Sequence, residues 1–174
     1  MPSLGYHGRV MTVTSSAESS RTGVAAHSAA ACRASKHERV QHLITADEHA
    51  LAELEVLLAT LPICSTGRVF VEVPDASWIG DIAVPARMIL TWLDRSARSG
   101  APGTGRACAP GAALTRAVTA WADEMLCGGV AGTRVHLLGG FLGTADIVDH
   151  LTDTLDVSAD AIRTPARFGL ATAR

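Results

Sequence analysis

The sequence has no long apolar run, no closely spaced cysteines and few aromatic residues. No window approaches the roughly 18 consecutive apolar residues that a membrane span requires, so we expect no contact with a membrane. The N-terminus lacks a basic segment followed by an apolar one, which argues against secretion. The four cysteines form no C-x-x-C pair, which argues against a zinc or disulfide framework. We therefore expect a cytoplasmic protein with reduced thiols.

The composition divides the 174 residues into two parts. Residues 1–40 are rich in Ser, Ala, Thr and Gly without sustained periodicity, so we expect a flexible arm. The arm has five basic and two acidic residues, a net charge of +3, whereas residues 41–174 have ten basic and fifteen acidic residues, a net charge of -5. The dilute positive charge of the arm and the acidic remainder make a nucleic-acid partner unexpected. The second part is long enough to form one domain.

Apolar runs and helical periodicity alternate from residue 41 onward. Asp47 is placed to cap a helix over 51–61, and Thr144 to cap a later helix whose apolar face includes Ile147 and Leu151. Gly128-Gly129 is expected to end the helix between them, which covers 114–126. The expected strands cover 42–46, 69–73, 88–93, 134–138 and a short stretch within 160–168. No full helix is expected over 75–87.

This alternation predicts an α/β fold, a Rossmann-like parallel sheet of about five strands with helices on both faces, preceded by the flexible arm. In such sheets, ligands bind beyond the carboxyl ends of the strands. The loops over 46–50 and 139–144 are therefore the candidate sites. The first loop has Asp47 and Glu48 where a dinucleotide fingerprint has glycines, which disfavours an ordinary NAD site there.

The second loop is more permissive towards a ligand. Gly139, Gly140 and Gly143 allow close approach of the backbone, and the helix that follows offers its positive N-terminal end to an anion. The same glycines are also compatible with a plain, tight connection between a strand and a helix, so local sequence leaves both interpretations open. No G-x-S-x-G or H-E-x-x-H motif is present, and we assign no catalytic or metal-binding residue.

The order of motifs resembles the C-terminal, NAD(P)H-binding domain of the siderophore-interacting protein family, relatives of ferredoxin reductases. The matching segments are, in chain order, Ala46-Asp47-Glu48-His49-Ala50-Leu51-Ala52-Glu53, Val69-Phe70-Val71-Glu72-Val73-Pro74-Asp75-Ala76, Trp92-Leu93-Asp94-Arg95 and Leu138-Gly139-Gly140-Phe141. The resemblance implies a cofactor site, and together with the two loops it nominates Asp47, Glu48, His49, Arg95, Gly139, Gly140, Gly143 and Thr144. Arg95 is expected to contact a phosphate or a ribose.

Two functional hypotheses remain open at this stage. In the first, the domain binds NAD(P)H and assists ferric-siderophore reduction on a separate flavin protein. No flavin is expected on this chain, because the family's flavin-binding barrel would not fit in a 40-residue arm whose single tyrosine is Tyr6. In the second, the domain is a non-catalytic interaction or regulatory module that has kept the fold and lost the cofactor site.

Overall fold

The computed structural model describes residues 40–126 and 132–170. A parallel sheet of five strands, in the order β3-β2-β1-β4-β5, forms its centre. The strands are β1 (Gln41–Asp47), β2 (Thr66–Val73), β3 (Arg87–Asp94), β4 (Thr133–Leu137) and β5 (Ile162–Arg163). The strand order reverses between β1 and β4: β2 and β3 are added on one side of β1, and β4 and β5 are added on the other side.

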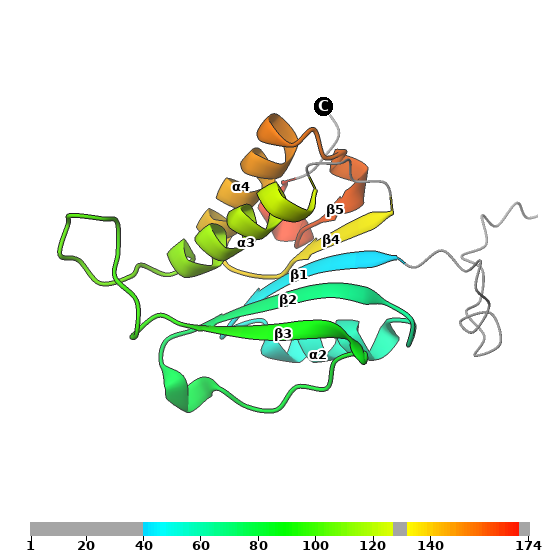
Figure 1. Cartoon of the computed structure of the whole chain (residues 1–174), viewed down its shortest axis with the longest axis horizontal. Coiled ribbons are helices and arrows are strands. Elements are labelled where there is room, and N and C mark those ends of the chain that lie inside the picture. Colours follow the sequence, from blue (N-terminus) through cyan, green and yellow to red (C-terminus); the bar gives the residue numbers. More distant parts are fainter. Residues whose placement is uncertain (1–39, 127–131, 171–174) are drawn as a thin grey trace, which may run out of the picture.

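Helices cover both faces of the sheet, as Figure 1 shows. Helix α2 (Leu51–Thr60) lies on one face, and α3 (Ala112–Met125) and α4 (Phe141–Asp149) lie on the other. A π-helical turn, His150–Thr154, continues α4. Short 3-10 turns occur at Ala76–Trp78, Ala159–Ala161 and Ala166–Phe168. No helix in the described part of the chain is long and apolar enough to cross a membrane.

Alternation along the central strand creates two hydrophobic cores. Leu43 packs with α3 and α4, whereas Ile44 and Ala46 pack with α2, because successive side chains of a strand point to opposite faces. Leu54 of α2 is fully buried, and burial of one such side chain contributes about 1.5–3 kcal/mol. Both faces of β1 are therefore buried, which explains why its sequence does not alternate between apolar and charged residues.

The sequence-based prediction of the fold class is confirmed, and two details of it are wrong. Asp47 does not cap α2: its Oδ1 accepts a hydrogen bond from the backbone N–H of His49 at 3.0 Å, and a turn separates it from the helix. Thr144 does not begin α4, which starts at Phe141. Its buried hydroxyl donates to the carbonyl of Gly139 instead. The crossover over 75–87 has no full helix, as expected, and Gly128-Gly129 and residues 1–39 lie outside the described residues.

Two histidines are buried side by side at the start of the sheet. His42 of β1 and His136 of β4 stack with ring centroids 5.8 Å apart, and they are 3% and 9% exposed. Burial, the neighbouring His136 and Arg134 lower the pKa of His42 to about 4. Burial, Arg163 and Arg134 lower the pKa of His136 as well. Both imidazoles are therefore neutral near pH 7.

We expect this pair to make the fold sensitive to acid. The unfolded chain protonates His42 near pH 6.5 and the folded chain near pH 4, so stability is lost as the pH falls through this window. The loss for His42 is on the order of 2–3 kcal/mol. Urea unfolding of the His42→Gln variant at pH 7 and pH 4.5 should show a smaller difference than the wild type. The exposed His49→Gln control should retain the full difference, and an unchanged pH dependence in His42→Gln would contradict this assignment.

Candidate functional site

A cleft of about 290 Å³ opens at the carboxyl ends of β1, β2 and β4. This is the edge of the sheet where the strand order reverses, the place where ligands bind in open α/β folds. The residues that line it come from the ends of β1 and β2, from three loops and from the first turns of α3 and α4: Asp47, Glu48, His49, Glu72, Arg95, Pro110, Gly111, Leu114, Gly140, Phe141, Leu142 and Gly143.

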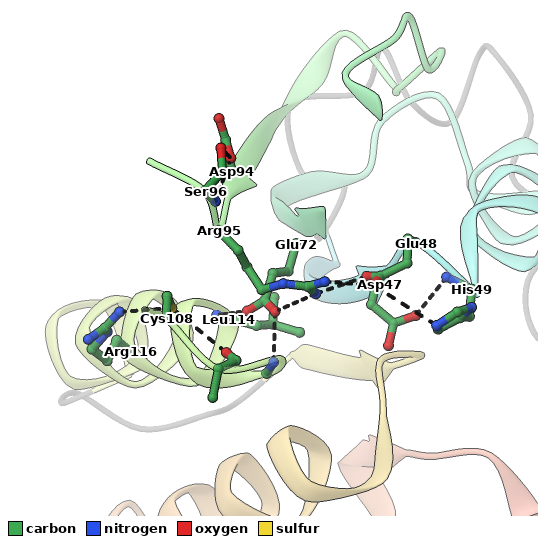
Figure 2. A network of polar contacts seen from close by, with 12 residues as sticks. Asp47, Glu48, His49, Glu72, Asp94, Arg95, Ser96, Cys108, Leu114 and Arg116 are labelled. Atoms are coloured by element: carbon green, nitrogen blue, oxygen red, sulfur yellow. Dashed lines mark hydrogen bonds and ion pairs between the residues drawn. The ribbon is translucent and has the colours of Figure 1, made fainter. Parts of the chain in front are cut away.

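Arg95 lies between two carboxylates at one side of the cleft (Figure 2). Its Nη2 donates to Glu48 Oε1 at 2.8 Å and its Nη1 donates to Glu48 Oε2 at 3.1 Å, which makes a bidentate ion pair. Nη1 also donates to Glu72 Oε1 at 3.1 Å. One guanidinium thus links the loop after β1, strand β2 and the loop after β3.

This pairing fixes the charged state of the network. Burial alone would raise the pKa of Glu48, but the hydrogen bonds from Arg95 and its positive charge outweigh burial, so the pKa of Glu48 is lowered. The hydrogen bond to Glu48 leads the causes that raise the pKa of Arg95. Glu48 is therefore ionised and Arg95 is charged near neutral pH.

Glu72 also caps helix α3. The carboxylate is 1% exposed, and it accepts the backbone N–H of Gly111 at 2.7 Å and that of Leu114 at 2.8 Å. Gly111, the residue before α3, has a φ of 84° and no side chain of its own with which to cap the helix. A buried acid from β2 therefore performs the capping that Ser or Asp usually performs locally.

A glycine turn forms the opposite side of the cleft. Gly140 precedes the first residue of α4, and no side chain in the described residues caps that helix. A Cβ added at Gly140 would lie 3.3 Å from Asp47 Oδ2, so the carboxylate of Asp47 sits directly beside this turn. A Cβ at Gly143 would lie 3.1 Å from the Cα of Gly111, so glycine there allows α3 and α4 to approach closely.

The described lining residues give the cleft an acidic interior and an apolar rim. Asp47, Glu48 and Glu72 are opposed by one cation, Arg95, for a formal charge of -2. At the rim, Phe141 is 49% exposed and Leu142 is 73% exposed. The ring of Phe141 also makes an edge-on contact with Phe168, with centroids 5.5 Å apart. Any ligand must accommodate both the negative interior and this apolar rim.

The structure brings six of the eight sequence-predicted residues to this cleft. They are Asp47, Glu48, His49, Arg95, Gly140 and Gly143. Gly139 and Thr144 do not line the cleft, and the Thr144 hydroxyl donates a hydrogen bond to the Gly139 carbonyl. Sequence reasoning missed Glu72, although an acid within the apolar run Val69-Phe70-Val71-Glu72-Val73 is a signal that a buried charge needs a partner.

In the described ranges, no group of three or more His, Cys, Asp or Glu side chains is placed to hold a metal ion. His42 lies in the sheet beside His136 rather than with His49 and Asp47 at the cleft.

Comparison with known proteins identifies the family. Residues 39–163, well over half of the chain, match the family model described as siderophore-interacting protein. The chain belongs to the siderophore-interacting protein family. The matched segment contains the whole sheet, both glutamates of the Arg95 network and the glycine turn.

Two solved structures share the fold. The siderophore-interacting protein SipS from Aeromonas hydrophila is 20% identical, with a TM-score of 0.53, and the match covers 71% of this chain and 48% of that one. A siderophore utilization protein from T. fusca is 22% identical, with a TM-score of 0.54, and the match covers 71% of this chain and 42% of that one. The chain thus spans less than half the length of either protein. No curated protein matches the sequence.

Proposed function

We propose that this domain binds NAD(P)H in the cleft and serves the reduction of ferric siderophores together with a flavin that a separate protein carries. The observation that carries the proposal is the first turn of α4, which opens into the cleft at the strand-order reversal without a side chain to cap it. Unpaired backbone N–H groups and the helix dipole favour an anionic group at this position. The names of the two related structures support the link to siderophores.

The cleft fits one end of a dinucleotide. Its volume of about 290 Å³ is just below the roughly 300–1,000 Å³ typical of small-molecule sites, so the remainder of the molecule would lie over the exposed edge. Phosphates belong near Gly140 and the N-terminus of α4. The carboxylate of Asp47 repels a phosphate but is a good acceptor for ribose hydroxyls. The cleft therefore favours a ribose beside Asp47 and a phosphate displaced towards the glycine turn.

The protein residues in this proposal bind and orient the cofactor. When bound, the reduced nicotinamide supplies a hydride, which is chemistry of the cofactor itself. Arg95 is a positioning residue: its hydrogen bonds to Glu48 and Glu72 use both Nη1 and Nη2, which leaves less of the guanidinium for a phosphate than the sequence suggested. Its role is to hold Glu48, directly after β1, beside Glu72, whose carboxylate in turn binds the N–H groups at the start of α3.

Isothermal titration of the full chain with NADPH and NADH tests this proposal. We expect saturable heat with at least one of them at submillimolar concentration, and competition by the other. The Asp47→Asn variant should bind more weakly, because an amide offers one neutral acceptor oxygen to the ribose hydroxyls where the carboxylate offers two charged ones. Absence of heat with both nucleotides at millimolar concentration would overturn cofactor binding. The purified chain should also be colourless, and a yellow preparation would overturn the assignment of the flavin to a separate protein.

A second candidate function rests on the charge and the rim of the cleft. The formal charge of -2, the paired state of Arg95 and the exposed Phe141 and Leu142 favour a non-catalytic module that contacts another protein. A pull-down from native lysate with the wild type and a Leu142→Glu variant discriminates the two functions. The module is supported if the wild type recovers a flavin protein, the Leu142→Glu variant does not recover it, and the wild type does not bind NADPH. NADPH binding without any recovered partner contradicts it.

A further inference from the structure

A second cavity lies at the opposite edge of the sheet, where β1 and β4 begin. It has a volume of about 260 Å³ and is enclosed by the end of α2 and by the loop that precedes β2. None of its residues lines the cleft at the carboxyl edge. The cavity is therefore independent of the proposed cofactor site.

Three buried polar side chains in this cavity lack hydrogen-bond partners among the described residues. The atoms are His42 Nδ1, Ser65 Oγ and His136 Nε2, and the three residues are 3%, 1% and 9% exposed. A buried polar atom without a partner costs about 1–3 kcal/mol, so three around one cavity are a strong departure from ordinary packing. Their convergence indicates a group that supplies the missing hydrogen bonds.

The neighbouring charges identify the sign of that group. Arg134 is the charged residue of the cavity lining, and no carboxylate is present in that lining. The adjoining hollow, which shares His136, contains Arg163 and Glu53. Neutral imidazoles can place a proton on either nitrogen, so both rings and the Ser65 hydroxyl can donate hydrogen bonds. A cation would be repelled by Arg134, whereas an anion would be stabilised.

The remaining walls are apolar. Leu57 of α2 and Leu61 and Pro62 just after it line the cavity, together with Thr60, whose hydroxyl donates to the carbonyl of Leu57. Inorganic phosphate or acetate would leave this surface unused, whereas a molecule with an apolar body would remove it from water. We propose that the cavity binds a small organic carboxylate, whose carboxylate accepts hydrogen bonds from His42, Ser65 and His136 at the Arg134 side and whose apolar body contacts the end of α2.

Calorimetric titration of the full chain with benzoate, benzamide and acetate tests this site. Benzoate should bind saturably, benzamide at least about tenfold more weakly because it lacks the charge, and acetate at least about tenfold more weakly because it lacks the ring. No heat with benzoate at 10 mM, or equal affinity for benzoate and benzamide, would overturn the proposal. In that case water molecules satisfy the three polar atoms.

Matched variants locate the binding. Arg134 is exposed, so Arg134→Gln should fold normally and weaken benzoate binding about tenfold. Arg87→Gln, an exposed arginine at the start of β3 on the far side of the sheet, should bind benzoate as the wild type does. Benzoate binding that Arg134→Gln leaves unchanged would overturn this placement. Titration of Arg134→Gln with NADPH should match the wild type, because that cleft is at the other edge.

Discussion

Replacement of Glu72 by alanine is expected to destabilise the domain by about 3–5 kcal/mol, the usual result when one partner of a buried ion pair is removed. The change removes three hydrogen bonds at once. The N–H groups of Gly111 and Leu114 lose their acceptor, and Arg95 loses one of its two carboxylates. A small domain has a total stability of about 5–15 kcal/mol, so this loss would remove a large part of the free energy of unfolding.

Chemical denaturation measures the loss, and a graded series tests its cause. Glu72→Gln keeps the shape and one carbonyl acceptor but places an amide nitrogen against a helix N–H or Arg95, so its stability should fall between those of the wild type and Glu72→Ala. Glu55→Ala, on the exposed face of α2, is the matched control and should change stability by less than about 0.5 kcal/mol. Equal stability of Glu72→Ala and Glu55→Ala would refute the capping role of Glu72.

The fold could be predicted from sequence because its main signals are local. Short runs rich in apolar residues indicate strands that are buried on both faces, and in β1 the successive residues Leu43 and Ile44 pack into different cores. The carboxyl ends of parallel strands share one edge, so the sequence alone predicts that the loops after β1 and β4 lie near each other. Six of the eight nominated residues meet there for that reason.

The interactions within the site could not be predicted because they join distant segments. In the sequence, Glu72 is an acidic residue within a strand, and nothing indicates its partners. The fold brings β2 beside the start of α3, where the carboxylate accepts two backbone N–H groups. Arg95 was nominated for a ligand, yet Glu48 and Glu72 already bind it. The predicted helix caps were wrong because residue type alone does not decide which backbone group a side chain binds. Asp47 and Thr144 are common capping residues, but here Asp47 accepts the N–H of His49 and Thr144 donates to the carbonyl of Gly139.

The histidine pair shows the same limit. His42 and His136 belong to strands that are far apart in the chain and become neighbours only because β4 pairs with β1. Neither histidine is among the residues that the sequence nominated for a site. Strand order, which sequence patterns do not specify, decides which polar side chains share a cavity.

Replacement of Gly140 by valine is expected to abolish NADPH binding, if the proposed cofactor site is correct, while the fold is retained. The backbone at Gly140 has φ -63° and ψ 157°, an extended conformation that valine adopts readily, so the change creates no backbone strain. The new Cβ would press on Asp47 Oδ2 at 3.3 Å, and the two methyl groups would occupy space where a phosphate must approach the N–H groups of α4.

Three measurements make this result decisive. Circular dichroism of Gly140→Val should show unchanged helix content, and calorimetry of this variant should show no heat with NADPH. Gly140→Ala should bind NADPH more weakly than the wild type, because its single methyl group only partly obstructs the phosphate. Arg98→Ala, an exposed substitution in the loop after β3, should bind NADPH as the wild type does. If Gly140→Val binds NADPH with unaltered affinity, the nucleotide does not approach the N-terminus of α4. The exposed rim at Phe141 and Leu142 would then be better explained as a contact surface for another protein.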